Sequence, residues 1–282
     1  MGIPHSSRPI CSLGPPLVPI ASTWATKPNV REINGTSVLI TGGGSAIGAG
    51  AAKHFVHQGA RVTISGRREE SLQAVASRLG DNCHVVVGEV ASAADRERMV
   101  DGAVDHGSKL DALISNAGNM HRNDVVDFYE QQLLDVFNTN VVAGMMLCKQ
   151  AHDHLVVTHG CIVFVGSVHT QRAFPNVSPY AATKGALEAL TGVLAAELGK
   201  DNFRVSCVRP GAVLTEINVR AGVTTADEQR ERRDGMGSMH ALGRIDTVQE
   251  IAEAFEYLVR ADWSTGNVLT VDGGLGLGVT ND

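Results

Sequence analysis

The sequence predicts an α/β fold in which helices cover both faces of a doubly wound, parallel sheet of the Rossmann type. Short runs of β-branched and apolar residues alternate with helical stretches from residue 36 onward. These runs lack the apolar–polar alternation of a strand with one wet face, so both faces of each strand should be buried. The chain has 282 residues, enough for a single α/β domain with a large core.

The first 35 residues differ in composition from the rest of the chain. Six of the nine prolines lie before residue 30, and proline opposes both helix and strand formation. We therefore predict an irregular N-terminal extension over residues 1–35 and a single domain over residues 36–282. The extension has no acidic residue before Glu32, as in an organelle transit peptide, but its prolines oppose the amphipathic helix that such a signal needs.

Seven strands are expected, each a short β-branched run that leads into Gly, Ser or Asn. They lie within residues 36–44, 60–67, 83–90, 110–118, 160–168, 203–211 and 267–274. The helices expected between them lie within residues 46–59, 68–80, 94–107, 141–155, 186–199 and 247–260. This alternation predicts the doubly wound sheet, in which ligands bind at the carboxyl ends of the strands.

A glycine-rich turn, TGGGSAIG from Thr41 to Gly48, follows the first predicted strand and leads directly into a helix. Glycines let the backbone turn tightly and approach a pyrophosphate, whose charge the helix N-terminus then stabilises. A glycine-rich turn alone is a weak signal, but its place between an apolar strand and a helix indicates a dinucleotide site.

The end of the second predicted strand bears on the choice of dinucleotide. NAD sites usually carry an acidic residue about 20 residues beyond the glycine turn, which binds the ribose 2′-hydroxyl. Here Ser65 and Gly66 are followed by Arg67 and Arg68. Guanidinium groups suit the 2′-phosphate of NADP, so we expect NADP, with NAD as the alternative. In that alternative, the two arginines simply begin an exposed helix and pair with Glu70 or with solvent.

Tyr180 and Lys184 stand four positions apart at the start of an Ala- and Leu-rich helix. This spacing places both side chains on one face of the helix, although two ordinary solvated residues would show the same pattern. An ammonium ~4 Å from a phenol contributes on the order of 4 kcal/mol at an effective dielectric constant of ~20. We therefore expect Lys184 to lower the pKa of Tyr180 and to make it an acid–base catalyst at neutral pH.

Taken together, the glycine turn, SNAG after the fourth strand, GS after the fifth and Y-x-x-x-K on the next helix resemble the short-chain dehydrogenases/reductases. The order and spacing of these motifs carry the resemblance, which covers roughly residues 36–276. It implies an oxidoreductase that transfers a hydride between NADP(H) and a carbonyl or secondary alcohol of a small organic substrate. The alternatives are an NAD-dependent alcohol dehydrogenase of the same fold and a catalytically silent dinucleotide-binding regulator.

The resemblance implies four catalytic residues, namely Asn140, Ser167, Tyr180 and Lys184. Asn140 is favoured over Asn138 because an apolar run follows it, as in the family. In the family interpretation, Tyr180 is the general acid/base activated by Lys184, which also holds the nicotinamide ribose. Ser167 binds the substrate oxygen, and Asn140 anchors a water molecule in the proton relay.

The expected cofactor contacts combine the glycine turn, the two arginines and the positions that the resemblance supplies. They are Thr41, Gly42, Ser45, Ile47, Gly48, Arg67, Arg68, Glu89, Val90, Asn116, Ala117, Gly118, Tyr180, Lys184, Pro210, Gly211, Val213 and Thr215. Three positions depart from the family pattern. Ala46 stands at a glycine position of the turn, Glu89 where an aspartate commonly meets the adenine, and Ser115 at the first asparagine of N-N-A-G.

The substrate pocket is expected to be formed by residues 168–177 and by the long segment from Glu216 to Leu242, which we interpret as a lid. His169, Arg172 and Phe174 are candidates for substrate contact. A loop histidine or arginine is more often solvated, and a loop phenylalanine more often packs inward, so the sequence does not identify the substrate.

Charge and cysteine content restrict the partners. The formal net charge of -6 and the absence of Lys/Arg runs oppose nucleic-acid binding, and no apolar stretch is long enough for a membrane span. Five scattered cysteines without C-x-x-C pairs indicate no metal site and a reducing, cytoplasmic setting. The resemblance further implies a homodimer or homotetramer formed through helices near 141–155 and 180–198 and through the last sheet edge.

Overall fold

The computed structural model describes residues 31–213 and 235–280, which contain seven parallel strands in one sheet. The strand order is β3-β2-β1-β4-β5-β6-β7. The strands span Ser37–Thr41 (β1), Arg61–Gly66 (β2), Cys83–Val87 (β3), Ala112–Ser115 (β4), Cys161–Val165 (β5), Arg204–Pro210 (β6) and Val268–Val271 (β7). The predicted fold class, an α/β doubly wound parallel sheet, is confirmed, and every predicted strand range contains one observed strand.

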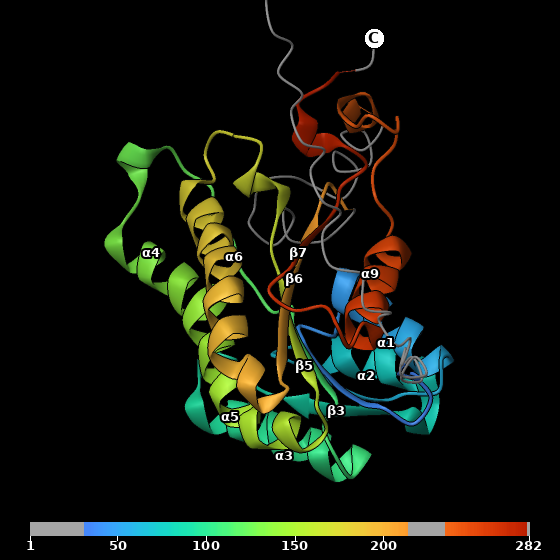
Figure 1. Ribbon diagram of the computed structural model, residues 1–282. Helices are drawn as coiled ribbons and strands as arrows, with labels where there is room; N and C mark the ends of the chain where they lie inside the picture. Colours follow the sequence, from blue (N-terminus) through green and yellow to red (C-terminus); the bar gives the residue numbers. More distant parts are fainter. Residues whose placement is uncertain (1–30, 214–234, 281–282) are drawn as a thin grey trace, which may run out of the picture.

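Helices cover the sheet in two layers (Figure 1). Side chains such as Phe55 of α1 and Phe255 of α9 fill the core on one face, together with α2, while Met99 of α3 and Leu147 of α5 fill the other face with α6. All four side chains are buried, as β-branched strands with two covered faces require. The helices span Ala46–His57 (α1), Glu69–Leu79 (α2), Ala93–Gly107 (α3), Glu130–Phe137 (α4), Ala143–Val157 (α5), Ser178–Leu198 (α6) and Val248–Arg260 (α9).

The strand order reverses at β1. Val38 of this strand pairs with Val62 of β2 on one side and with Ala112 of β4 on the other. The chain builds β2 and β3 outward from β1 and then crosses back to β4, so the connections that follow β1 and β4 run in opposite directions. Such a reversal opens a crevice at the carboxyl ends of the strands, where this fold binds its ligands.

Local capping explains where α9 begins. The Thr247 hydroxyl accepts a hydrogen bond from the Glu250 backbone N–H at 3.3 Å, and the Glu250 carboxylate accepts one from the Thr247 N–H at 2.9 Å. This reciprocal pair satisfies two N–H groups that a helix start leaves without partners.

Helix α4 was not among the predicted helices. It has only eight residues, and the apolar side chains of Leu134 and Phe137 are partly exposed, so it lacks the long apolar stripe that marks a helix in a sequence. A π-helical turn, Asn138–Val142, joins it to α5.

Part of the predicted N-terminal extension packs against the domain. The Arg31 guanidinium donates hydrogen bonds to the backbone carbonyls of Thr158 and His159, at 3.1 and 2.7 Å, and Ile33 belongs to the buried core. Residues 1–30 lie outside the described part of the chain, so the extension stays a prediction.

Candidate active site

A cavity of about 390 Å³ lies at the carboxyl ends of the strands, beside the reversal of strand order. Most of the residues predicted to bind cofactor or substrate contribute to its wall. They are Gly42, Ser45, Ile47, Arg67, Arg68, Glu89, Val90, Asn116, Ala117, Gly118, Ser167, Tyr180, Lys184, Pro210, Gly211 and Val213. Residues from six different strand ends and from α6 therefore meet around one space.

Three of the described residues that were predicted to be catalytic or to bind the cofactor do not line this cavity. Thr41, Gly48 and Asn140 are buried behind its wall, where they contact other parts of the protein. Thr215 and most of the predicted lid, residues 214–234, lie outside the described part of the chain.

The glycine turn and the start of α1 form one end of the cavity. Gly42 has φ +68°, a conformation that favours glycine, and Gly44 and Ser45 both line the wall. Ser45 is the N-cap of α1 but makes no side-chain cap hydrogen bond, and no acidic residue occupies the first helical turn. The positive end of the helix dipole thus has no anionic side chain within its own first turn, which suits a phosphate of a dinucleotide.

Ala46 occupies a conformation that a side chain disfavours. Its φ is +45°, in the left-handed region, and it lies at the first position of α1. A Cβ in this region costs about 1–2 kcal/mol. The position where the sequence departs from the family glycine is therefore a position at which the turn requires glycine-like geometry.

Thr41 and Asn116 join the ends of β1 and β4. The Thr41 hydroxyl accepts hydrogen bonds from the backbone N–H groups of Asn116, at 3.1 Å, and of Ala117, at 3.0 Å. The Asn116 side-chain amide donates back to the Thr41 carbonyl at 2.9 Å and to the Gly42 carbonyl at 3.3 Å. Thr41 shapes the cavity by holding its two walls together, although its side chain does not face the cavity.

Tyr180 lies on the cavity wall at the start of α6, and a hydrogen bond joins its hydroxyl to Ser167. Burial raises the pKa of Tyr180, and the hydrogen bond with Ser167 only partly opposes this effect. The expected lowering of the Tyr180 pKa by Lys184 is therefore wrong for this structure. Burial of the phenolate dominates, so Tyr180 holds its proton.

The orientation of Lys184 explains this correction. Its Nζ donates a hydrogen bond to the backbone carbonyl of Val165 at 2.7 Å and lies 5.4 Å from the centre of the Tyr180 ring. The side chain is 4% exposed, and burial lowers the pKa of its ammonium to about 8. The four-residue step does place both groups on one face of α6, but the ammonium is directed at β5 and not at the phenol oxygen.

Asn140 sits in the π-helical turn between α4 and α5, behind the catalytic wall. Its side-chain oxygen accepts from the Asn119 backbone N–H at 2.9 Å, and its amide donates to the Asn119 carbonyl and the Thr183 hydroxyl, each at 3.0 Å. Thr183 in turn donates to the Tyr180 carbonyl at 2.7 Å. Asn140 thus links the loop after β4 to the first turn of α6, while its role in a proton relay stays a prediction.

Arg67 and Arg68 line the cavity directly after β2. The Arg67 Nε lies 3.3 Å from a carboxylate oxygen of Glu89, and the Arg67 side chain is 68% exposed. Arg67 thus forms its ion pair with Glu89 and not with Glu70. Both arginines line the cavity directly after the end of β2, where Ser65 and Gly66 carry no carboxylate.

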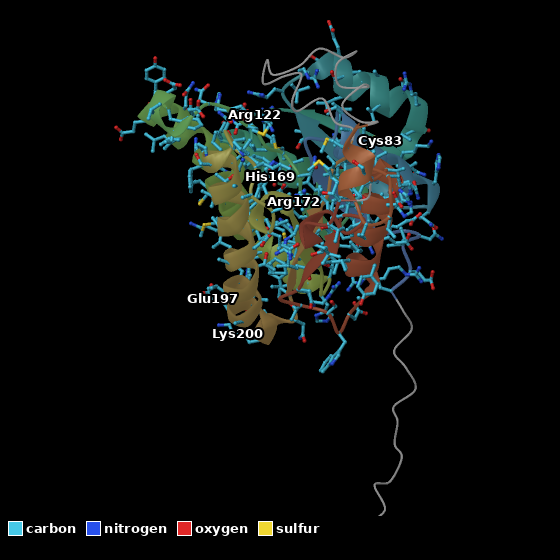
Figure 2. The ribbon with its side chains drawn as sticks, turned by 90° about the horizontal axis from the view of Figure 1, so that it is seen from above. Cys83, Arg122, His169, Arg172, Glu197 and Lys200 are labelled. Carbon is cyan, nitrogen blue, oxygen red and sulfur yellow. The ribbon has the colours of Figure 1, made fainter. Side chains whose placement is uncertain are left out.

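The loop after Ser167 contributes two of the three suggested substrate contacts. His169 and Phe174 line the cavity, whereas Arg172 lies behind them and donates hydrogen bonds to the carbonyls of Met239 and Leu275, at 3.3 and 3.1 Å. Arg122, which was not predicted, also lines the wall and is close enough to His169 to lower its pKa. In the view from above, Arg122, His169 and Arg172 lie near one another over the middle of the molecule (Figure 2).

Asp246 supports the loop that contains Gly211, and no sequence motif indicated this role. Its carboxylate accepts a hydrogen bond from the Gly211 N–H at 3.0 Å, and its own backbone N–H donates to the Ala212 carbonyl at 3.0 Å. Asp246 is 6% exposed, and burial raises its pKa to about 6 against the opposing effects of the Gly211 N–H and of His240. The hydrogen bond between Asp246 and Gly211 joins residues 35 positions apart, so no local sequence pattern predicts it.

The described residues, 31–213 and 235–280, show neither a metal site nor a membrane-spanning helix. They contain no group of three or more His, Cys, Asp or Glu side chains arranged to hold a metal ion. None of their helices is long and apolar enough to cross a membrane.

Known proteins resemble this chain over most of its length. A family model described as enoyl-(acyl carrier protein) reductase matches residues 42–276. A tropinone reductase homolog of Arabidopsis thaliana is 34% identical over 250 residues, which cover 86% of this chain and 93% of the relative.

Two solved structures share the fold. A short-chain dehydrogenase/reductase of unknown function from Caenorhabditis elegans, solved with cofactor, has a TM-score of 0.82 at 26% identity and covers 88% of this chain and 97% of its own. A 3-ketoacyl-(acyl-carrier-protein) reductase from Brucella melitensis, complexed with NADH, has a TM-score of 0.77 at 28% identity, with coverages of 86% and 99%.

The fold and the cavity define a dinucleotide-dependent α/β enzyme, and the comparisons make this assignment more specific. The chain belongs to the short-chain dehydrogenase/reductase family, as the sequence motifs predicted. It is an NAD(P)-dependent oxidoreductase.

The strained turn at Ala46 yields a stability prediction. We expect Ala46→Gly to stabilise the protein by about 1 kcal/mol, because removal of the Cβ relieves left-handed strain that exceeds the added entropy of the unfolded chain. Ala49→Gly, within the same helix, should instead destabilise the protein by about 0.5–1 kcal/mol. Urea unfolding measures the change in the free energy of unfolding for each variant. Changes of the same sign in both variants would contradict the strain argument.

Proposed function

We propose that this protein interconverts a carbonyl and a secondary alcohol of a small organic substrate with NADP(H), using Tyr180 as general acid/base. One observation carries the proposal. The hydrogen-bonded pair of Tyr180 and Ser167 and the buried Lys184 line the same cavity as the glycine turn at the start of α1. Two of the related proteins, the tropinone reductase homolog and the 3-ketoacyl-(acyl-carrier-protein) reductase, are named as reductases.

The residues present fit a dinucleotide along this cavity. The turn at Gly42–Ile47 and the start of α1 would hold the phosphates, and Pro210, Gly211 and Val213 would flank the nicotinamide. The bound cofactor supplies or accepts the hydride at the substrate carbon. The protein's own part of the reaction is to bind the substrate oxygen and to move a proton to or from it.

Tyr180 is suited to donate that proton. Burial raises its pKa, so the phenol is protonated at neutral pH, which is the form that a carbonyl oxygen requires during reduction. Ser167 lies beside it and binds the same oxygen, which polarises the carbonyl. In the reverse direction Tyr180 must lose its proton, and the positive charge of Lys184 then stabilises the phenolate.

Tyr180→Phe tests this mechanism. Loss of the proton donor should lower kcat by roughly 10²- to 10⁴-fold, while cofactor affinity stays within about threefold of the wild type. The substrate is found first by screening ketones and secondary alcohols for a change in nicotinamide absorbance. Tyr257→Phe, at an exposed site on α9, is the matched control and should not change turnover. Undiminished turnover in Tyr180→Phe would exclude the mechanism, and cofactor binding without turnover of any substrate would favour a silent regulator.

The preference for NADP rests on the charges at the end of β2. Arg67 and Arg68 line the cavity there, while Ser65 and Gly66 offer no carboxylate to a ribose 2′-hydroxyl. A guanidinium can bind a 2′-phosphate with two charge-assisted hydrogen bonds, whereas the free hydroxyl of NAD gains no such interaction.

Replacing both arginines should reverse this preference. Arg67→Ala combined with Arg68→Ala is expected to weaken NADPH binding by about 10- to 100-fold, the size of one hydrogen bond to a charged group. NADH binding should change by less than about threefold. Arg78→Ala, exposed at the other end of α2, is the control for net charge. Titrations followed by nicotinamide fluorescence measure the affinities of the three proteins for both cofactors, and wild-type protein that binds NADH as tightly as NADPH would refute the proposal.

We further propose a homodimer or homotetramer in the cytoplasm. Val142 and Met145 on the α4–α5 side and Val193 on α6 expose 41–55% of their surface, on helices that the family resemblance places at an interface. The described cysteines are all unpaired and buried, which agrees with a reducing compartment.

Sedimentation velocity tests the oligomer. At micromolar concentration the wild type should sediment as a dimer or tetramer, and Met145→Glu combined with Val193→Glu should shift it toward monomer, because charge on these faces disfavours their burial. The exposed Val157→Glu change, at the end of α5, should leave the sedimentation coefficient unaltered. A wild-type monomer would contradict the proposal.

A further inference from the structure

His169 is attached to the proposed catalytic serine by two hydrogen bonds. Its ring Nδ1 lies 2.9 Å from the Ser167 hydroxyl oxygen, and its backbone N–H donates to the same oxygen at 3.4 Å. The residue follows Ser167 by two positions, in a short 3₁₀ turn, Val168–Thr170, that directly follows Ser167. The ring also lines the cavity, on the same wall as Tyr180.

A hydroxyl has one proton and two lone pairs, so its partners decide where the proton points. If the His169 Nδ1 were an acceptor, the Ser167 hydroxyl would donate its proton to the ring. The substrate oxygen would then receive no hydrogen bond from Ser167. If Nδ1 carries the proton, both lone pairs of the Ser167 oxygen accept N–H groups of His169. The serine proton is then free to point at Tyr180 or at the substrate oxygen.

We propose that His169 is a positioning residue whose Nδ1–H fixes the Ser167 hydroxyl as a donor to the substrate oxygen. This inference deepens the proposed function and rests on it. The serine proton then points at the carbonyl oxygen of the substrate. His169 lowers the barrier to carbonyl reduction because it orients the Ser167 hydroxyl, which already lies beside the substrate site.

The charge state of His169 agrees with this role. Burial, the nearby Arg122 and Lys184 lower the pKa of the ring to about 4, so the imidazole is neutral at neutral pH and carries a single N–H. A neutral ring can hold that proton on either nitrogen, and the neighbouring partner decides which one. In the proposed arrangement, that proton lies on Nδ1, the nitrogen that is 2.9 Å from the Ser167 oxygen.

Packing holds the ring in this position. Its centre lies 4.8 Å from that of Phe174 and 5.4 Å from that of Tyr180, the latter at an interplanar angle of 89°. The turn is fixed as well, because Thr170 donates a hydrogen bond to the Glu188 carboxylate at 2.8 Å, and Arg209 pairs with that carboxylate at 2.6 Å. The imidazole therefore has few orientations, which is what a positioning group needs.

A double-mutant cycle separates this role from a general packing role. His169→Phe keeps an aromatic ring against Phe174 and Tyr180 but removes the Nδ1–H, and it should lower kcat for carbonyl reduction about tenfold with little change in cofactor affinity. His169→Asn keeps an amide nitrogen at the position of Nδ1 and should recover activity to within about threefold of the wild type.

The cycle is completed in a Ser167→Ala background. If His169 acts through the serine hydroxyl, His169→Phe should cost less than about twofold there, because the oriented group is gone. A tenfold loss of kcat in both backgrounds would overturn the proposal. A kcat of His169→Asn no higher than that of His169→Phe would overturn it as well. Thermal unfolding of each variant shows whether a loss of activity merely follows a loss of structure.

A measurement without substrate distinguishes this inference from the proposed function. In protein with ¹⁵N-labelled histidine at neutral pH, the His169 ring should show protonated Nδ1 and unprotonated Nε2, and Ser167→Ala should shift the Nδ1 signal. The His169→Asn spectrum assigns the signals by their absence. An Nε2–H tautomer would refute the inference even if carbonyl reduction is found, whereas a protein without turnover would refute the proposed function and leave this readout intact.

Discussion

One buried hydroxyl holds together the two strand ends on which the site depends. Thr41 accepts N–H groups from Asn116 and Ala117, and the Asn116 amide donates back to the carbonyls of Thr41 and Gly42. Because the chain diverges after β1 and β4, nothing in the sheet ladder itself fixes the distance between the glycine turn and the loop after β4. These side-chain hydrogen bonds do so, and the cavity lies between the two segments that they join.

Burial decides the electrostatics of the cavity wall around Tyr180 more than pairwise charge does. Removing water raises the pKa of Tyr180 and lowers that of Lys184, so each group is driven toward its neutral form. The ammonium is 5.4 Å from the centre of the phenol ring and donates a hydrogen bond to the Val165 carbonyl, so its attraction for a phenolate does not offset that cost. The protonated phenol that results is the form that reduction of a carbonyl uses.

The sequence predicted the parts of the structure that local patterns specify. Buried β-branched runs such as residues 37–41 mark strands because few other structures hide both faces of such a run. The glycine turn and the step from Tyr180 to Lys184 also follow from local geometry. The direction of the Lys184 amine could not be predicted in this way, because spacing determines the face of a helix on which a residue lies but not its side-chain rotamer. Contacts between distant segments, such as Asp246 with Gly211, leave no periodic signal, and the short helix α4 leaves a weak one.

The pair formed by Arg67 and Glu89 bears on how the cofactor end selects its ligand. Both side chains are partly or largely exposed, and an ion pair of this kind contributes about 0–1 kcal/mol. A charge-assisted hydrogen bond from the same guanidinium to a phosphate is worth about 1.5–3 kcal/mol. In the proposed binding of NADP, Glu89 would therefore not withhold Arg67 from the 2′-phosphate, because the charge-assisted hydrogen bond is stronger than the exposed ion pair.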